Sequence, residues 1–171
     1  MGRNLSVEIE RFPIAGKFTI ARGSRTEAVV VTATITDGAV RGRGECVPYA
    51  RYGETPEGVA DAIRSLADAV AGGMSREELQ AAMPAGAARN ALDCALWDFD
   101  AKLTGMPAHV AAGIHRLPSA TTAYTISLGT PESMAEATAK AAHRPLLKIK
   151  LGGDGDETRI AAVRKAAPKA E

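Results

Sequence analysis

The chain has 171 residues, of which 46% are hydrophobic, and this favours one domain or slightly more with a buried core. Its 21 lysines and arginines nearly balance its 20 aspartates and glutamates, and only 4% of residues are aromatic, so neither a nucleic acid nor a membrane surface is expected as a partner. No apolar run approaches the roughly 20 residues that span a bilayer, and the N-terminus lacks the apolar core of a signal peptide, which predicts a cytoplasmic protein.

The N-terminal part of the chain has the pattern of β-strands. Apolar residues alternate with polar ones over residues 5–9, which is typical of a half-buried strand. Glu27–Thr36 is rich in β-branched residues and runs into an Asp-Gly turn signal, so Val40–Cys46 is expected to return antiparallel. Loops are predicted on either side of this hairpin, at Lys17–Arg25 and Val47–Thr55.

Helices are predicted next. Thr55 is expected to cap a helix whose apolar stripe extends to Val70. Ser75 begins a capping-box pattern that predicts a second, short helix. A longer helix is predicted over Ala87–Leu103, with an apolar stripe that includes Leu103.

The pattern changes after Pro118. Thr122–Leu128 predicts a strand, Thr130 starts a helix to about Ala142, Leu146–Leu151 predicts a second strand, and Asp156–Ala167 a second helix. Strand and helix in alternation, with short connections, are typical of parallel βα units.

This change predicts two domains in an α/β protein. Residues 1–118 are expected to form an α+β domain with an antiparallel sheet and helices. Residues 119–171 are expected to be the first two βα units of a second, α/β domain.

Two lysines lie one residue apart in the second predicted βα strand. Lys148 and Lys150 project from one face of the strand, and Leu147 and Ile149 from the other. In a barrel, the lysines would point inward, near the strand ends where barrel active sites lie. Two close ammonium groups disfavour each other's charged form, so one of them could take a proton from carbon at neutral pH. The spacing alone also fits a strand with a solvated lysine face.

Other candidate residues are weaker on sequence alone. Arg22, beside Gly23 in the first predicted loop, could close over a carboxylate, although without further context the residues favour a solvated loop arginine. Thr125 lies in the first βα strand, where threonine is an ordinary β-former. Gly152–Gly155 lacks the pattern of a phosphate-binding loop and predicts a turn.

No metal site is predicted from the side chains of this chain. Cys46 and Cys94 belong to no ligand pattern and are interpreted as two buried free thiols. A group of polar and aromatic residues on the long helix is interpreted as helix surface or a domain interface: Asp93, Trp97, Asp98 and Asp100.

Five stretches together resemble the enolase superfamily, in its mandelate racemase/muconate lactonizing enzyme branch. They are FTIARGSRTEAVVV, GRGECVPYARYGET, PAGAARNALDCALWDFDAK, TAYTISLGTPESM and LLKIKLG. Within that branch they are most similar to the dipeptide epimerases of the L-Ala-D/L-Glu type. The resemblance implies an α+β capping domain whose two loops cover the active site of a (β/α) barrel.

The resemblance also implies roles for four residues. Lys150 would be the general base for one stereoisomer, with Lys148 beside it and the substrate carboxylate. Thr125 would contact the substrate, and Arg22 would bind the side-chain carboxylate of a Glu moiety. The implied reaction is 1,1-proton transfer on a small-molecule dipeptide from cell-wall peptide, through an enolate that Mg²⁺ stabilises.

This chain departs from the family pattern in one respect. The family's metal-binding carboxylates lie on the third, fourth and fifth barrel strands and the opposing lysine on the sixth, whereas only two βα units are predicted here. The chain is therefore expected to be the N-terminal portion of a longer enzyme, inactive alone. Two alternatives stay open: another racemase or cycloisomerase of the superfamily, and a non-catalytic remnant that associates with a partner. Family members are often oligomeric, so a homo-oligomer is a further expectation by analogy.

Overall fold

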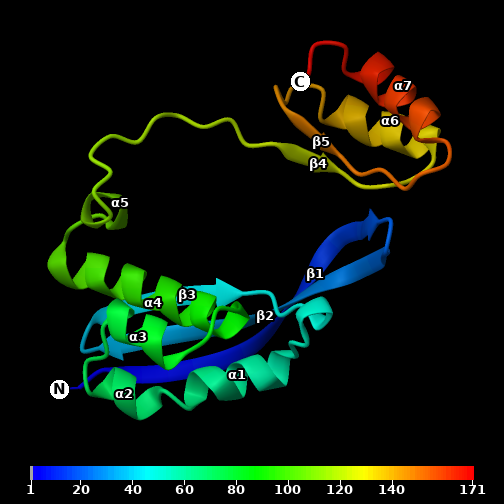
Figure 1. Ribbon diagram of the computed structural model, residues 1–171. Coiled ribbons are helices and arrows are strands. Elements are labelled where there is room, and N and C mark those ends of the chain that lie inside the picture. Colours follow the sequence, from blue (N-terminus) through cyan, green and yellow to red (C-terminus); the bar gives the residue numbers. More distant parts are fainter. Residues whose placement is uncertain (1) are drawn as a thin grey trace. The chain divides into compact units, whose positions relative to one another are not determined.

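The computed structural model describes residues 2–171, which divide into two compact units (Figure 1). The first unit comprises the chain up to Phe12 together with Ala28–Leu117. The second comprises Pro13–Glu27 together with Pro118–Glu171. Across the described residues, no helix is both long enough and apolar enough to cross a membrane.

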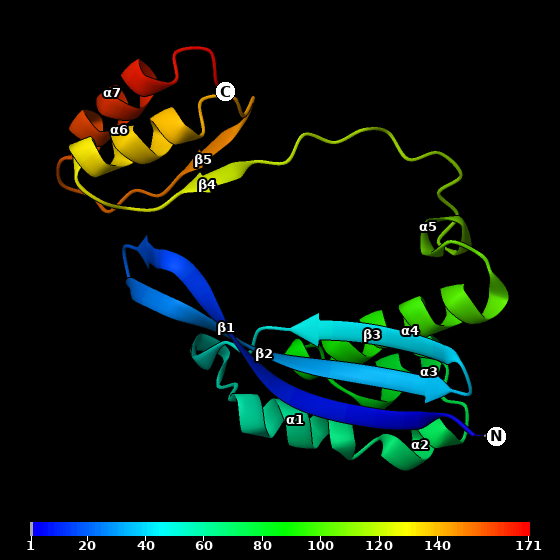
Figure 2. The ribbon, with the colours of Figure 1, turned by 180° about the vertical axis from the view of Figure 1, so that it is seen from behind.

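The N-terminal sheet has three strands in the order β1-β2-β3, which are β1 (Asn4–Ile20), β2 (Gly23–Asp37) and β3 (Val40–Cys46). Figure 2 shows them side by side in front of α3 and α4. β2 and β3 pair antiparallel, with Val31 opposite Cys46 and Asp37 opposite Val40. Gly38 has a φ of 57°, which suits the two-residue connection that the sequence predicts.

The prediction of a loop at Lys17–Arg25 is wrong. β1 and β2 continue through it as a hairpin that turns only at residues 21–22. Gly23 has a φ of 143°, a backbone conformation that other residues rarely adopt, so this glycine closes the turn and does not end the strands early. The hydroxyl oxygens of Thr19 and Ser24 lie 3.0 Å apart across the hairpin and share a hydrogen bond.

The helices of the first unit are η1 (Ala50–Tyr52), α1 (Pro56–Arg64), α2 (Ala67–Ala71), α3 (Arg76–Ala82), α4 (Ala87–Thr104) and α5 (Ala108–Ala111). Both predicted caps are confirmed. Thr55 accepts a 3.0 Å hydrogen bond from the Gly58 N–H, and Ser75 forms a capping box with Glu78.

Two details of the helix prediction are wrong. The helix predicted to reach Val70 is broken into α1 and α2 near Ser65, whose hydroxyl donates to the Ala62 carbonyl oxygen at 2.8 Å. Such side-chain bonds compete with the helical pattern. Leu103, expected on the buried stripe of α4, is 51% exposed in the last turn of that helix.

The core of the first unit depends on close contact between α4 and β3. Gly42 and Gly44 face α4, and a Cβ atom at Gly44 would collide with the carbonyl oxygen of Ala91. One at Gly42 would collide with Ala95 and Phe99. The two glycines therefore let α4 pack directly on the strand, and the middle of its apolar stripe is fully buried: Ala91, Leu92, Ala95, Leu96 and Phe99.

The two cysteines differ from the expectation of two buried thiols. Cys46 is buried, and its thiol lies 3.6 Å from the Val31 carbonyl oxygen. Burial raises the pKa of the Cys46 thiol to about 11, so it is protonated at neutral pH. Cys94 is exposed although its Cβ atom lies beside Gly44 of β3, so its predicted burial is wrong.

The second unit contains two βα units, built from β4 (Tyr124–Ile126), α6 (Pro131–Lys140), β5 (Leu147–Ile149) and α7 (Asp156–Ala166). β4 and β5 pair in parallel, which confirms the predicted repeat, although both strands are shorter than predicted. The helices pack on one face of the strands around a small core of Ile126, Met134, Ala141 and Val163, with Leu147 and Ile149 against it.

Replacing Gly44 by alanine should destabilise the first unit. The added Cβ atom must push α4 away from β3, and overpacking of this kind costs about 1–3 kcal/mol or more. Chemical denaturation of Gly44→Ala, followed by circular dichroism, should show the loss. Gly72→Ala is the matched control, because the nearest atoms to its Cβ lie 3.4 Å away and its φ is −74°. Equal midpoints for the two variants would contradict the packing argument.

Candidate functional site

The parallel register brings two of the predicted site residues together. Thr125 on β4 lies directly opposite Lys148 on β5, so both side chains project from the same face of the strands. Lys148 is exposed on that face, while Leu147 and Ile149 pack against the core under the helices. The strand therefore separates lysine from the apolar side as its alternation predicts.

Lys150 follows β5 directly and continues the same face. Its N–H donates to the Ile126 carbonyl oxygen at 3.1 Å, which extends the parallel pairing by one bond. The side chain is half-buried, and Nζ lies 6.0 Å from the centroid of the Phe18 ring on the hairpin. A cation at this distance from a ring face is attracted to it. The hairpin end and the two strands thus meet at Lys150.

A second contact ties the hairpin to the strand ends. The N–H of Leu128, just after β4, donates to the Thr19 carbonyl oxygen at 3.1 Å. Arg22 lies exposed at the turn of the hairpin. Among the described contacts, Phe18 and Thr19 are the hairpin residues that contact the strand ends. The structure places Thr125, Lys148 and Lys150 on one face of the strands, and it leaves Arg22 exposed at the turn of the hairpin that carries Phe18 and Thr19.

The second predicted loop, Val47–Thr55, is confirmed and is anchored by a carboxylate that the sequence analysis missed. Glu54 accepts a hydrogen bond of 2.7 Å from the Ala87 N–H at the start of α4, and one of 2.9 Å from the Tyr49 N–H. These two bonds hold the pKa of the Glu54 carboxyl below its usual range, and the bond from Ala87 has the larger effect. The loop presents the exposed rings of Tyr49 and Tyr52, whose centroids are 6.3 Å apart. A signal for Glu54 existed: an acidic residue immediately before the N-cap of a helix.

The glycine-rich segment after Lys150 is the turn that the sequence predicts, and a second missed carboxylate closes it. Asp156 accepts from the Gly152 N–H at 3.1 Å and from the Gly153 N–H at 2.7 Å, and Arg159 also donates to it. The hydrogen bonds from Gly152, Gly153 and Arg159 keep the pKa of the Asp156 carboxyl below its usual range despite some desolvation. The sequence signal for this contact is an aspartate at the first position of a helix that follows a glycine-rich turn.

The acidic side chains of α4 are partly exposed, which agrees with the interpretation as helix surface, and they bond to neighbours within the first unit. Asp98 accepts from the Arg43 N–H at 2.8 Å and from Lys102 Nζ at 2.6 Å. The guanidinium of Arg76 lies 3.3 Å from the centroid of the Trp97 ring. Within residues 2–171, no three His, Cys, Asp or Glu side chains gather closely enough to hold a metal ion. The residues present therefore do not fit a Mg²⁺ site.

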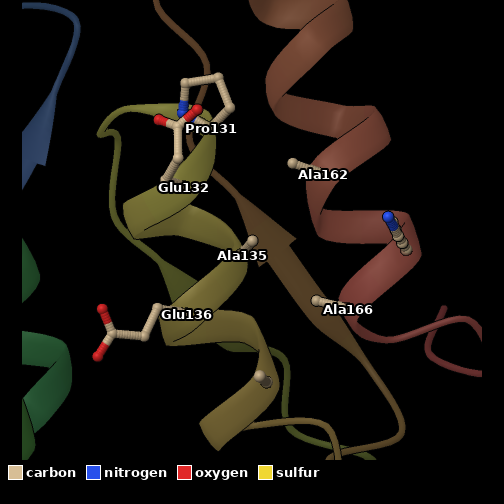
Figure 3. Close-up of a pocket in the computed structure, with 8 residues that line it drawn as sticks. Pro131, Glu132, Ala135, Glu136, Ala162 and Ala166 are labelled. Atoms are coloured by element: carbon tan, nitrogen blue, oxygen red, sulfur yellow. The ribbon is translucent and has the colours of Figure 1, made fainter.

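A shallow groove of about 570 Å³ lies between α6 and α7 (Figure 3). These helices cover the face of the strands that carries Leu147 and Ile149, opposite the lysines. Alanines line its floor, and Glu132, Glu136 and Lys165 flank it. None of the predicted site residues lines it. We therefore place the candidate site on the opposite side of the strands.

Comparison with known proteins places these features in a family. Residues 4–112 match the mandelate racemase / muconate lactonizing enzyme, N-terminal domain. The L-Ala-D/L-Glu epimerase of Escherichia coli (strain K12) is 43% identical over 170 residues, which cover 98% of this chain and 53% of that protein. An N-acetyl-D-glutamate racemase of Pseudoalteromonas sp is 38% identical over 146 residues, which cover 83% of this chain and 45% of that protein.

Solved structures agree in fold. An enolase family member from Agrobacterium tumefaciens with homology to dipeptide epimerases, with bound sodium and L-Ala-L-Glu, superposes with a TM-score of 0.91 at 56% identity, over 99% of this chain and 52% of that one. A dipeptide epimerase from Cytophaga hutchinsonii, complexed with Mg and D-Ala-L-Val, gives a TM-score of 0.83 at 25% identity, over 98% of this chain and 49% of that one.

The chain spans about half the length of the relatives and structures it matches. The match includes the antiparallel sheet with its helices, and the coverage extends through the two parallel βα units. By this match the chain belongs to the mandelate racemase / muconate lactonizing enzyme family of the enolase superfamily.

Proposed function

We propose that this chain is the N-terminal half of an epimerase that moves the α-proton of a glutamate whose nitrogen is acylated, with L-Ala-D/L-Glu as its first substrate. The observation that carries the proposal is the face shared by Thr125, Lys148 and Lys150. It occurs in a chain that is 43% identical to an L-Ala-D/L-Glu epimerase. The reaction would be a 1,1-proton transfer at the glutamate α-carbon.

The lysines have distinct roles in this proposal. Lys150 is the more enclosed, since it is half-buried and its ammonium group lies 6.0 Å from the centroid of the Phe18 ring, whereas Lys148 is exposed. We assign it the removal and return of the α-proton on one face of the substrate. Lys148 is more exposed and lies beside Thr125, where a cation and a hydroxyl can orient the substrate carboxylate.

The chain does not contain the whole reaction centre. Mg²⁺ is the family's cofactor and would supply stabilisation of the enolate charge, but residues 2–171 offer no cluster to bind it. Its ligands and the opposing base would come from the remainder of a longer protein. We accordingly propose that the 171 residues alone are inactive.

Arg22 is proposed to recognise the side-chain carboxylate of the glutamate moiety. Its guanidinium can make two parallel hydrogen bonds to a carboxylate, and its position at the turn of a hairpin leaves it free to reach a ligand. The hairpin is fixed at Phe18 and Thr19, so the arginine extends from an anchored base.

A second candidate substrate is an N-acetylated glutamate. The racemase of Pseudoalteromonas sp is 38% identical and acts, by its name, on N-acetyl-D-glutamate. L-Ala-Glu and N-acetyl-Glu share a glutamate with an acylated nitrogen and two carboxylates. They differ in the alanine amino group, so the discriminating residue must lie where that group binds.

We also propose the domain boundaries and the setting of the enzyme. A capping domain at 1–118 and the start of a barrel at 119–171 are supported by the family match over residues 4–112 and by the structural division between Leu117 and Pro118, although the hairpin Pro13–Glu27 groups with the second structural unit. Cytoplasmic metabolism of cell-wall peptide is the proposed setting, since it would provide L-Ala-D-Glu.

Lys150→Ala in the full-length protein should remove α-proton exchange from one stereoisomer of L-Ala-Glu and spare more of the other. Loss of a general base costs roughly 10²- to 10⁴-fold. Proton NMR in D₂O measures exchange from L-Ala-L-Glu and L-Ala-D-Glu separately. Lys165→Ala, on the outer helix α7, is the control and should leave both rates unchanged. An equal loss from both stereoisomers in Lys150→Ala would refute the assigned role.

Arg22→Ala should lower kcat/KM for glutamate-containing substrates by about 10- to 100-fold, because a charge-assisted pair is lost. Dipeptides with an uncharged second residue should be affected much less. A panel of L-Ala-X dipeptides together with N-acetyl-Glu measures this difference. Lys17→Ala removes an exposed cation from the same hairpin and serves as the control. The substrate assignment is wrong if the wild-type protein shows no preference for glutamate.

A further inference from the structure

An ion pair lies shortly after Lys150 in the chain and is more buried than the pair between Lys140 and Glu136 in the same unit. Arg159 Nη1 and Asp156 Oδ1 are 2.9 Å apart, and both side chains are only 22% exposed. The pair between Lys140 and Glu136 has a similar distance of 2.8 Å, but its side chains are 74% and 72% exposed. The first pair is thus enclosed by the loops around it, whereas the second lies on the helix surface.

Asp156 binds the loop that follows Lys150. Its two carboxylate oxygens accept from the Gly152 N–H at 3.1 and 3.2 Å, and Oδ2 accepts from the Gly153 N–H at 2.7 Å. Gly153 has a φ of 111°, so the backbone can turn both amides toward one carboxylate. Lys150 is therefore held on both sides: by its own N–H on the Ile126 carbonyl, and by these bonds two and three residues later.

Arg159 extends the same network to the loop that follows β4. Its Nε donates to the Gly129 carbonyl oxygen at 2.9 Å, and its Nη1 donates to the Asp154 carbonyl oxygen at 2.7 Å. The two loops also touch directly, because Leu128 fills the space beside Gly152, where a Cβ atom would lie 2.9 Å from the leucine side chain. One arginine therefore bridges the loops that follow the strands of Thr125 and Lys150.

We infer that Asp156 and Arg159 form a positioning pair that fixes both strand-end loops and thereby holds Lys150 in place for proton transfer. The inference rests on the proposed function, since it names the residues on which the assigned base depends. Neither side chain touches the reacting atoms; they act through the backbone of the loops. Proton transfer tolerates little misplacement, and an error of about 1 Å can cost roughly 10²-fold in rate.

Three variants of the full-length protein separate the parts of the pair. Asp156→Asn removes the charge and leaves one oxygen for two glycine amides. Arg159→Lys keeps a cation near Asp156 but cannot also reach the Gly129 carbonyl, so it tests the bridge and not the charge. Glu136→Gln breaks the exposed pair on α6 and is the matched control.

Two measurements on these variants test the inference. Backbone hydrogen exchange, followed by mass spectrometry, should accelerate about tenfold or more at residues 151–155 in Asp156→Asn, and at residues 127–130 in Arg159→Lys, with no change in Glu136→Gln. Exchange of the substrate α-proton in D₂O should fall about tenfold or more from the stereoisomer that Lys150 serves, and less from the other. A merely structural defect would lower both equally.

The outcomes distinguish the two proposals. Unchanged loop exchange, or an equal loss from both stereoisomers, overturns the inference while the wild-type activity still supports the proposed function. If wild-type protein exchanges no α-proton from any N-acylated glutamate, the proposed function fails, and the catalytic part of the inference fails with it. Accelerated loop exchange in that case would leave Asp156 and Arg159 as the residues that order the loops.

Discussion

The parallel register of β4 and β5 is the constraint on which the candidate site depends. Because side chains alternate along a strand, pairing Thr125 with Lys148 sends both to one face and leaves Leu147 and Ile149 under the helices. A slip by one residue would place lysine in the apolar core and leucine on the site face. Burial of an unpaired ammonium group is costly, so the core of the second unit enforces the arrangement of its lysines.

Carboxylates that bind backbone amides perform a related task in the loops. Glu54 joins the loop around Tyr49 to the start of α4, and Asp156 joins the loop after Lys150 to the start of α7. Glu54 accepts from a first-turn amide of α4 that has no partner within the helix, whereas Asp156 lies in the first turn of α7 and accepts from amides of the preceding loop. Side chains on such loops gain the precision of the scaffold, which suits residues that recognise or orient a ligand.

Much of this fold follows from local chemistry that can be read in the sequence. The caps at Thr55 and Ser75, the Asp-Gly hairpin and the alternation of LLKIKL each depend on a few neighbouring residues, and each is confirmed. The spacing of Lys148 and Lys150 can be recognised in the same way, because it lies within one strand. Their chemical role, in contrast, is implied only by the resemblance to the enolase superfamily.

The features that were missed depend on distant contacts. The strands persist through Lys17–Arg25, where the Thr19 carbonyl oxygen accepts a hydrogen bond from the N–H of Leu128, far along the chain. Arg159 reaches Gly129, thirty residues earlier in the chain, and no local pattern indicates that contact. The described residues hold the paired lysines on one strand face and no cluster of His, Cys, Asp or Glu side chains that could bind a metal ion.

The proposed function depends most on Lys150 acting as one of two bases on opposite faces of a glutamate α-carbon. Incubation of the full-length protein with L-Ala-L-Glu in D₂O tests it most directly. The account predicts that the L-Ala-D-Glu formed in the first turnovers carries deuterium at the α-carbon while the remaining substrate is still protiated. Product that retains the original proton, or the absence of product, would contradict it.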